Sequence, residues 1–288
     1  KENIDLNIYL KEKGLILKNL SKDAWFIGDN TEQKLKEKIE RIGKPLKEWD
    51  VKIYYGIKTG LNEAFIIDNT KREEILNNCK DENERKRTEA IIKPILRGRD
   101  IKRYYYEWKG LWVIIIPAGW TNKNRSNETP ETFIKKTFSS LMIHLQQFQE
   151  KAKKREDQGD YWWELRQCAY YSEFEKEKIA WGGVGTKLIT TIVPKGIYLN
   201  APANFLVHKN IRFLQGIFNS NCISWYYDLI KTTLGTKGGR FYIYDALNLP
   251  IPPISSENEP IVKQIETLVD KILAITKDKD YLQNPEKQ

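Results

Sequence analysis

Three short segments of the chain combine glycine with basic side chains. They are Lys58-Thr59-Gly60, the run Arg97-Gly98-Arg99 that continues through Lys102 and Arg103 into three tyrosines, and the stretch 231–240, which holds Lys231, Lys237 and Arg240. Glycine lets a backbone approach a phosphate, and arginine can donate two parallel hydrogen bonds to a phosphate or to guanine O6 and N7. These segments predict nucleic-acid binding. The alternative for each is a turn with a solvated or ion-paired arginine, for example Arg99 paired with Asp100.

A fourth glycine-rich segment, Trp181-Gly-Gly-Val-Gly-Thr-Lys187, does not predict a nucleotide-phosphate loop. Lys187 is followed by Leu188 and not by Ser or Thr, as a P-loop requires. The next residues, 188–193, are β-branched and predict a strand, so no helix N-terminus would face a phosphate. We interpret the segment as a turn whose glycines let the backbone pack closely against a neighbouring segment. Lys187 remains a candidate DNA contact.

The sequence offers no convincing catalytic motif. Ile251-Pro-Pro-Ile254 superficially resembles the Asn-Pro-Pro-aromatic motif of amino-methyltransferases, but it has neither the polar nor the aromatic side chain that this chemistry needs. A nuclease needs clustered carboxylates with a nearby lysine, and Asp100 with Glu107 and Lys109 has that outline. Such triplets are expected by chance in a chain this rich in Lys and Glu. A metal-dependent restriction endonuclease remains an alternative hypothesis.

Charge and composition favour a polyanion partner. The 288 residues contain 48 Lys+Arg and 39 Asp+Glu, a net charge of +9. With 40% hydrophobic residues, global disorder is excluded, and the longest apolar run, 111–117, is too short to span a bilayer. The three cysteines are far apart and the two histidines isolated, which argues against a disulfide scaffold or a zinc site and suits a reducing cytoplasm.

The elements before residue 100 are expected to place the first two basic segments in turns. A helix should run from Asn30 to Gly43, and strands at 51–55 and 64–67 should flank the turn at Gly56–Gly60. Thr70 and Glu73 form a capping-box pattern that predicts a charged helix, and the charge run 81–88 predicts a solvated helix face.

The later elements mix strands and helices without a regular βαβ rhythm, which predicts an α+β fold. A buried strand at 111–116 precedes a long central helix that begins at Pro130 and carries an apolar stripe to Ala152, with His144 packed on it. Strand segments between 179 and 207 are followed by helices at 211–218 and 222–231. A C-terminal amphipathic helix follows at 259–276, and its stripe comprises Ile261, Ile265, Leu268, Ile272 and Ile275.

Six segments together give the chain a resemblance to a known family. They are YYGIKTGLNEAFII (54–67), IIKPILRGRDIKRYYY (91–106), DQGDYWWELR (157–166), EFEKEKIAW (173–181), RFLQGIFNS (212–220) and NLPIPPI (248–254). From about residue 21 to 255 the chain resembles the TaqI-like C-terminal specificity domain of adenine-N6 DNA methyltransferases, found in type II and IIG restriction–modification enzymes. The extended segment NLPIPPI, followed by a helix, also resembles the specificity subunits of type I restriction–modification systems.

The resemblance implies a target-recognition domain with a mixed, twisted β-sheet that binds double-stranded DNA without catalysis. A separate methyltransferase domain would flip the adenine and use S-adenosylmethionine. The chain begins with Lys, so we expect a fragment: residues 1–28 connect to the missing catalytic part, 29–255 recognise DNA, and 259–276 form the terminal helix. That helix packs on its own domain or contacts the missing domain or a second subunit.

Within DQGDYWWELR, we expect Trp162 and Trp163 in the core and Arg166 paired with Glu164. The candidate DNA contacts are Lys58, Thr59, Gly60, Arg97, Gly98, Arg99, Lys102, Arg103, Lys187, Lys231, Lys237 and Arg240. No cofactor and no membrane partner is expected for this fragment. A further alternative to duplex-DNA binding is an RNA-binding module, which would present exposed aromatic side chains for base stacking.

Overall fold

A computed structural model describes residues 29–185, 187–230, 239–240 and 242–278, together with residues 7, 8, 11, 14, 281 and 284. The helices named below are α2 (Asn30–Ile42), α3 (Asn62–Phe65), α4 (Asn69–Asn77), α5 (Glu82–Ile91), α6 (Trp120–Asn124), α7 (Pro130–Thr137), α8 (Ser139–Gln146), α9 (Gln149–Lys153), α10 (Tyr171–Phe174), α11 (Ile211–Phe218), α12 (Asn221–Ile230), α13 (Ile243–Leu247) and α14 (Glu259–Thr276). Two short 3-10 turns occupy Leu46–Trp49 and Gly98–Asp100.

Two four-stranded sheets form the framework, and two short ribbons complete it. The first sheet has the order β2-β10-β6-β8, from Lys52–Tyr55, Asn204–Val207, Lys178–Trp181 and Thr190–Val193, and all its pairs are antiparallel. The second has the order β3-β5-β4-β9, from Ile66–Asp68, Leu111–Ile114, Ile92–Leu96 and Tyr198–Leu199, with β4 and β9 parallel. The ribbons are β1 (Lys44–Pro45) with β12 (Pro250–Ile251), and β7 (Val184–Gly185) with β11 (Gly239–Arg240). This mixture confirms the predicted α+β class.

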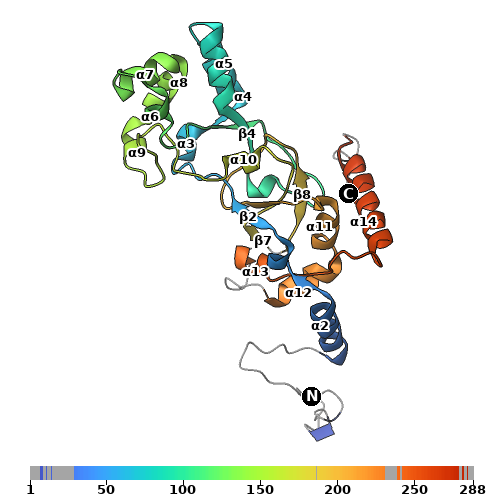
Figure 1. Ribbon diagram of the computed structural model, residues 1–288. Coiled ribbons are helices and arrows are strands. Elements are labelled where there is room, and N and C mark those ends of the chain that lie inside the picture. Colours follow the sequence, from blue (N-terminus) through green and yellow to red (C-terminus); the bar gives the residue numbers. More distant parts are fainter. Residues whose placement is uncertain are drawn as a thin grey trace.

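The first sheet separates two hydrophobic cores, and its strands β10, β6 and β8 are buried almost throughout. Successive side chains of a strand point to opposite faces. Phe205 and Ala180 therefore lie in one core, while their neighbours Leu206 and Ile179 lie in the other. Helices α3 to α9 gather around the first core at one end of the molecule, and α11 to α14 surround the second (Figure 1).

The predicted helix at 130–152 is divided into three. The apolar stripe is present, but the backbone leaves helical geometry at Phe138, with φ −133° and ψ 58°, and α7, α8 and α9 follow one another with breaks between them. His144 is buried as expected, and its Nε2 lies 2.9 Å from the carbonyl oxygen of Ala64. The stripe was therefore predicted correctly, but the continuity of the helix was not.

A buried carboxylate explains the break before α8. Glu84 on α5 is completely buried and accepts hydrogen bonds from Ser139 Oγ, at 2.7 Å, and from the backbone N–H of Ser140, at 2.9 Å. It thus satisfies one free N–H group, that of Ser140, at the first turn of α8. Burial raises the pKa of Glu84, but these hydrogen bonds, with one from the Lys80 N–H, outweigh burial and leave it lowered. The charge run 81–88 is a helix as predicted, yet Glu84 is not on a solvated face.

Two shorter predictions before residue 80 were wrong in detail. The run 64–67 is not one strand, because Ala64 and Phe65 belong to α3 and β3 begins at Ile66. The N-cap of α4 is Asp68, whose side chain accepts from the N–H of Lys71 at 2.8 Å, and not Thr70. The helix at 30–42 is confirmed, with Asp29 and Glu32 forming its capping box.

Helix α14 packs on α11 through a glycine. A Cβ atom at Gly216 would lie 2.6 Å from Ile265 Cγ2 and 3.2 Å from Val269 Cγ2, so the missing side chain permits the close approach. Val262, Val269 and Leu273 are buried against the domain, whereas Ile261, Leu268 and Ile275 are exposed. The predicted helix is confirmed, and it packs on its own domain with one apolar stripe while a second faces outward. Within the described part of the chain, no helix is long and apolar enough to cross a membrane.

Candidate nucleic-acid interface

The turn after β2 presents Lys58 on a fixed backbone. The N–H of Gly56 donates to the carbonyl of Ala203 at 2.8 Å, and the N–H of Ile57 donates to that of Leu199 at 2.6 Å. Thr59 is buried, and its hydroxyl bonds Asn62 Oδ1 at 2.7 Å, while Lys58 and Gly60 are exposed. Of the three predicted contacts in this turn, Lys58 is therefore the side chain free to reach a ligand, and Thr59 supports the turn.

Arg155, a buried residue that was not among the predicted contacts, supports the Lys58 turn from inside the protein. The guanidinium of Arg155 donates to the carbonyl oxygens of Thr59, Trp162 and Glu164, the Trp162 contact being 3.0 Å long. Its charge also lies 4.2 Å from the ring centroid of Phe65. Burial lowers the pKa of Arg155 to about 10, so it stays protonated at neutral pH. Arg155 therefore connects the Lys58 turn to the segment 157–166.

The segment 157–166 is built around a buried carboxylate. Glu164 accepts hydrogen bonds from the N–H groups of Gly119, Thr121 and Asp160, at 2.8 to 3.0 Å. Trp162 and Trp163 are buried as predicted. The predicted pairing of Arg166 with Glu164 was wrong, because Glu164 is used inside the protein. Arg166 Nη1 instead donates to Asp157 Oδ1 at 3.0 Å.

Arg97 is committed to an internal ion pair. Its Nε and Nη2 donate to the two carboxylate oxygens of Asp100 at 2.9 and 2.8 Å, and its backbone N–H adds a bond of 2.9 Å. Asp100 is 3% exposed; burial raises its pKa, but the bonds from Arg97 outweigh burial and lower it. Arg99 is exposed. The arginine paired with Asp100 is thus Arg97, and Arg99 is the one presented to a ligand.

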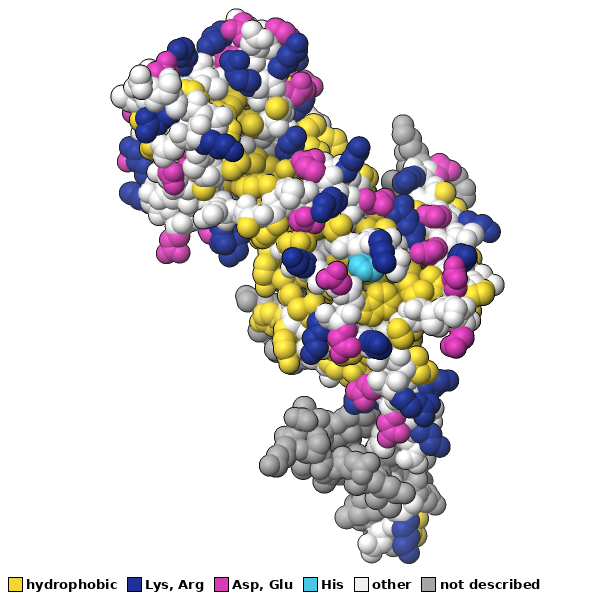
Figure 2. All heavy atoms as spheres, viewed as in Figure 1, with side chains coloured by type: hydrophobic (Ala, Val, Ile, Leu, Met, Phe, Trp, Pro, Cys, Tyr) yellow, Lys and Arg dark blue, Asp and Glu magenta, His cyan; other side chains and the backbone are white. Residues whose placement is uncertain are grey.

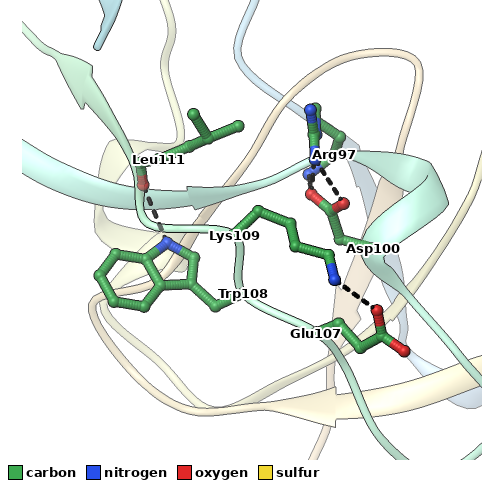
Figure 3. A network of polar contacts seen from close by, with 6 residues as sticks. All are labelled: Arg97, Asp100, Glu107, Trp108, Lys109 and Leu111. Atoms are coloured by element: carbon green, nitrogen blue, oxygen red, sulfur yellow. Dashed lines mark hydrogen bonds and ion pairs between the residues drawn. The ribbon is translucent and has the colours of Figure 1, made fainter. Parts of the chain in front are cut away.

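The carboxylates considered for a nuclease are each paired with a cation. Figure 3 shows Asp100 facing Arg97, while Glu107 faces Lys109 at 2.8 Å. Nor do three His, Cys, Asp or Glu side chains gather as metal ligands anywhere in the described ranges. The arrangement around Asp100 and Glu107 therefore gives no support to the nuclease hypothesis.

Lys102 and Arg103 lie beside the ends of α11 and α14. Arg103 Nη2 donates to the carbonyl of Asn219 at 2.8 Å, near the end of α11. Thr276 at the end of α14 donates to the carbonyl of Tyr104 at 3.2 Å. The basic run 97–103 is therefore divided: Arg97 at its start is paired with Asp100, and its second half borders α11 and α14.

Gly182 of the glycine-rich segment packs against the Arg97 turn. A Cβ atom at Gly98 would lie 3.3 Å from the Cα of Gly182, and one at Gly183 would lie 1.9 Å from the carbonyl oxygen of Pro202. This confirms that the glycines let the backbone pack closely against neighbouring segments. Lys187 is exposed. Arg240 lies in β11 and pairs with Val184. Lys231 and Lys237 lie outside the described residues.

The segment that follows β9 brings these turns together. A Cβ atom at Gly56 would lie 2.6 Å from the carbonyl carbon of Asn200, and the N–H of Asn200 donates to the carbonyl of Leu96, directly before Arg97, at 2.8 Å. Gly183 packs on Pro202 in the same segment. The structure thus brings the Lys58 turn, the start of the Arg97–Asp100 turn and Gly183 together around residues 199–203.

Positive charge is not concentrated on the face seen in Figure 2. Figure 2 shows Lys and Arg interspersed with Asp and Glu over the face in view, and a hydrophobic area lies between the two ends of the molecule. The net charge of +9 therefore does not locate the interface, which must be identified from local contacts.

Comparison with known proteins agrees with the predicted family. A family model described as the TaqI-like C-terminal specificity domain matches residues 93–251. No curated protein matches the chain.

Two restriction–modification enzymes are among the similar solved structures. One is the type IIG restriction endonuclease BpuSI, with 10% identity over 84% of this chain and 28% of that chain, at a TM-score of 0.48. The other is the type IIL restriction-modification enzyme MmeI in complex with DNA, with 12% identity over 82% of this chain and 30% of that chain, at a TM-score of 0.51. The chain thus spans less than a third of either enzyme, and the likeness to MmeI is one of fold. Since the family model covers more than half of the sequence, the chain belongs to the family of TaqI-like C-terminal specificity domains.

Proposed function

We propose that the chain is the part of a restriction–modification enzyme that recognises a target sequence in double-stranded DNA. Residues 29–255 form the recognition domain, 259–276 form its terminal helix, and residues 1–28 lead to the rest of the enzyme. The observation that carries the proposal is the convergence of the turns bearing exposed Lys58 and Arg99 on residues 199–203. Exposed cations on closely packed glycine turns suit phosphate contacts.

We propose further that catalysis resides in a separate domain. That domain would methylate adenine at N6 with S-adenosylmethionine, and this chain would hold no cofactor. Two observations support a partner domain: the chain spans less than a third of the similar enzymes, and α14 exposes Ile261, Leu268 and Ile275 on one stripe. A cytoplasmic location accords with its three free cysteines.

The first experiment measures binding of the 288-residue chain to duplex DNA at several salt concentrations. If about six phosphates are neutralised, log K falls against log[salt] with a slope near −5. Competition with single-stranded RNA serves as the control, and preferential binding of RNA or a flat salt dependence would count against the proposal.

A second experiment tests the absence of catalysis. The chain is incubated with mixed duplexes and labelled S-adenosylmethionine, and separately with supercoiled plasmid and Mg²⁺. We expect no label above background and no cleavage. Label in the DNA or a linear plasmid product would show that the chain carries an active site of its own.

A further inference from the structure

A hollow of about 440 Å³ lies beside the Lys58 turn. It is lined from one side by residues 55–58, at the end of β2, and from the other by residues 166–171, which lead into α10. These two segments are far apart in the sequence, so the fold itself creates the hollow. Its rim carries four exposed side chains of different chemistry: Tyr55, Lys58, Arg166 and Gln167.

The segment 166–171 is anchored although its first residues are exposed. The ring of Tyr170 packs on that of Tyr54 with centroids 4.9 Å apart, and Tyr54 packs on Phe205 of the central sheet at 5.2 Å. The Arg166 side chain is 51% exposed and is oriented by the 3.0 Å bond from its Nη1 to Asp157. Asp157 in turn packs against Gly60, where a Cβ atom would lie 3.0 Å from Asp157 Cβ. Arg166 and Lys58 are therefore held in a fixed relationship.

The residue types on this rim match the edges of base pairs. Arginine donates two hydrogen bonds to guanine O6 and N7, and glutamine pairs with adenine N6 and N7. Lysine is a point charge suited to phosphate. The bond to Asp157 uses Nη1 of Arg166 and orients the guanidinium without burying it. Of the arginines at the other turns, Arg97 is occupied by Asp100 and Arg103 by the carbonyl of Asn219.

We propose that Arg166 and Gln167 read adjacent base pairs in the major groove, with Arg166 on a guanine and Gln167 on an adenine, while Lys58 holds a neighbouring phosphate. This inference rests on the proposed function, since it assumes that the chain binds duplex DNA. It assigns sequence specificity to the rim of this hollow and backbone affinity to the Lys58 turn.

The test begins with selection of duplexes bound by the 288-residue chain from a randomised pool. Arg166→Ala should lose about 5- to 100-fold in affinity for the selected duplex, and repeated selection should show relaxed preference at one G·C pair. Gln167→Ala should relax the preference for one neighbouring A·T pair. Lys58→Ala should weaken binding to selected and unrelated duplexes by the same factor. Lys135→Ala, which removes an exposed lysine paired with Glu131 on α7, is the matched control and should change neither.

Arg166→Lys separates charge from geometry, because lysine keeps the charge but cannot form the two parallel bonds. It should retain affinity for unrelated duplexes and lose the G·C preference. The inference is overturned if the parent chain binds duplexes without preference, or if Arg166→Ala, with an unchanged Tm, keeps the full preference or weakens all sequences equally. Failure of the parent chain to bind any duplex at low salt would instead contradict the proposed function.

Discussion

Arg155 donates a hydrogen bond from inside the protein to the carbonyl oxygen of Thr59. The same guanidinium bonds the carbonyls of Trp162 and Glu164, so the Lys58 turn and the segment leading to Arg166 share one internal support. A planar guanidinium with five N–H donors can satisfy three carbonyl oxygens at once.

Replacement of Arg155 should therefore affect stability and binding together. Arg155→Met leaves buried carbonyl oxygens without donors, and we expect a loss of roughly 3–5 kcal/mol in the free energy of unfolding. Arg155→Lys should lose less, because one of the three bonds can form. Denaturant unfolding measures the first effect, and duplex affinity measured well below Tm gives the second. Unaltered stability of Arg155→Met would contradict this support role.

Arg97 and Arg99 should behave differently although they are two residues apart. Arg97→Ala leaves the buried Asp100 carboxylate without its cation, and we expect roughly 2–4 kcal/mol of destabilisation. Arg99→Ala should keep Tm within about 1 °C of that of the parent chain. It should weaken binding to all duplexes alike and reduce the slope of log K against log[salt] by about one. The measurements are thermal unfolding and salt-dependent binding. If Arg97→Ala lowered duplex affinity without lowering Tm, and Arg99→Ala lowered Tm, Arg97 would be the DNA contact.

Lys178 should make stability increase with pH. This side chain on β6 is fully buried, its Nζ donates to the carbonyl of Pro194 at 3.0 Å, and burial lowers its pKa to about 8. The unfolded chain, with a lysine pKa near 10.4, retains this proton at higher pH than the folded protein does. Raising the pH above about 8 therefore favours the folded state, by about 1 kcal/mol per pH unit until the unfolded lysine titrates.

The comparison that isolates Lys178 is between the parent chain and Lys178→Met. Unfolding free energies measured at pH 7, 8 and 9 should rise more steeply for the parent than for the variant. Parallel curves would mean that Lys178 does not titrate in this range.

Gly183→Ala should damage the fold locally. The added Cβ atom would lie 1.9 Å from a backbone oxygen of Pro202, so the 181–187 turn must move away from residues 199–203. We expect a loss of about 3 kcal/mol or more, at or above the upper end of the usual cost of overpacking. Gly119→Ala, whose nearest neighbour would be 3.9 Å away, is a control in which backbone strain from φ +76° acts without a clash. Equal Tm values for the two variants would contradict the close-packing argument.

The sequence predicted the elements with clear periodicity or caps, such as α2, α11 and α14. It could not resolve the run 64–67, because a short apolar run suits a buried strand and a buried helix equally. The division at Phe138 depends on Glu84, a partner distant in the chain, and no local pattern announces it.

The candidate site was predicted in part. Lys58, Arg99 and Lys187 are exposed, and the turns of Lys58 and Arg99 meet, whereas Thr59 and Arg97 are used internally. Arg155 was missed, although one signal existed: it lies three residues after Ala152 and seven after Phe148, on the apolar stripe of the predicted helix. A charged residue on an apolar stripe is a candidate for a buried polar role.

Strand pairing between distant parts of the chain has a consequence for folding kinetics. β2 pairs with β10, and Lys44 at the start of β1 pairs with Ile251 in β12, so both pairings join early and late residues. Closing such long loops costs entropy before any contact compensates, which slows folding. During synthesis the edge of β2 stays without its partner until residue 207 has left the ribosome. A nascent chain arrested before that point should be open to proteolysis at β2, which then has no partner strand.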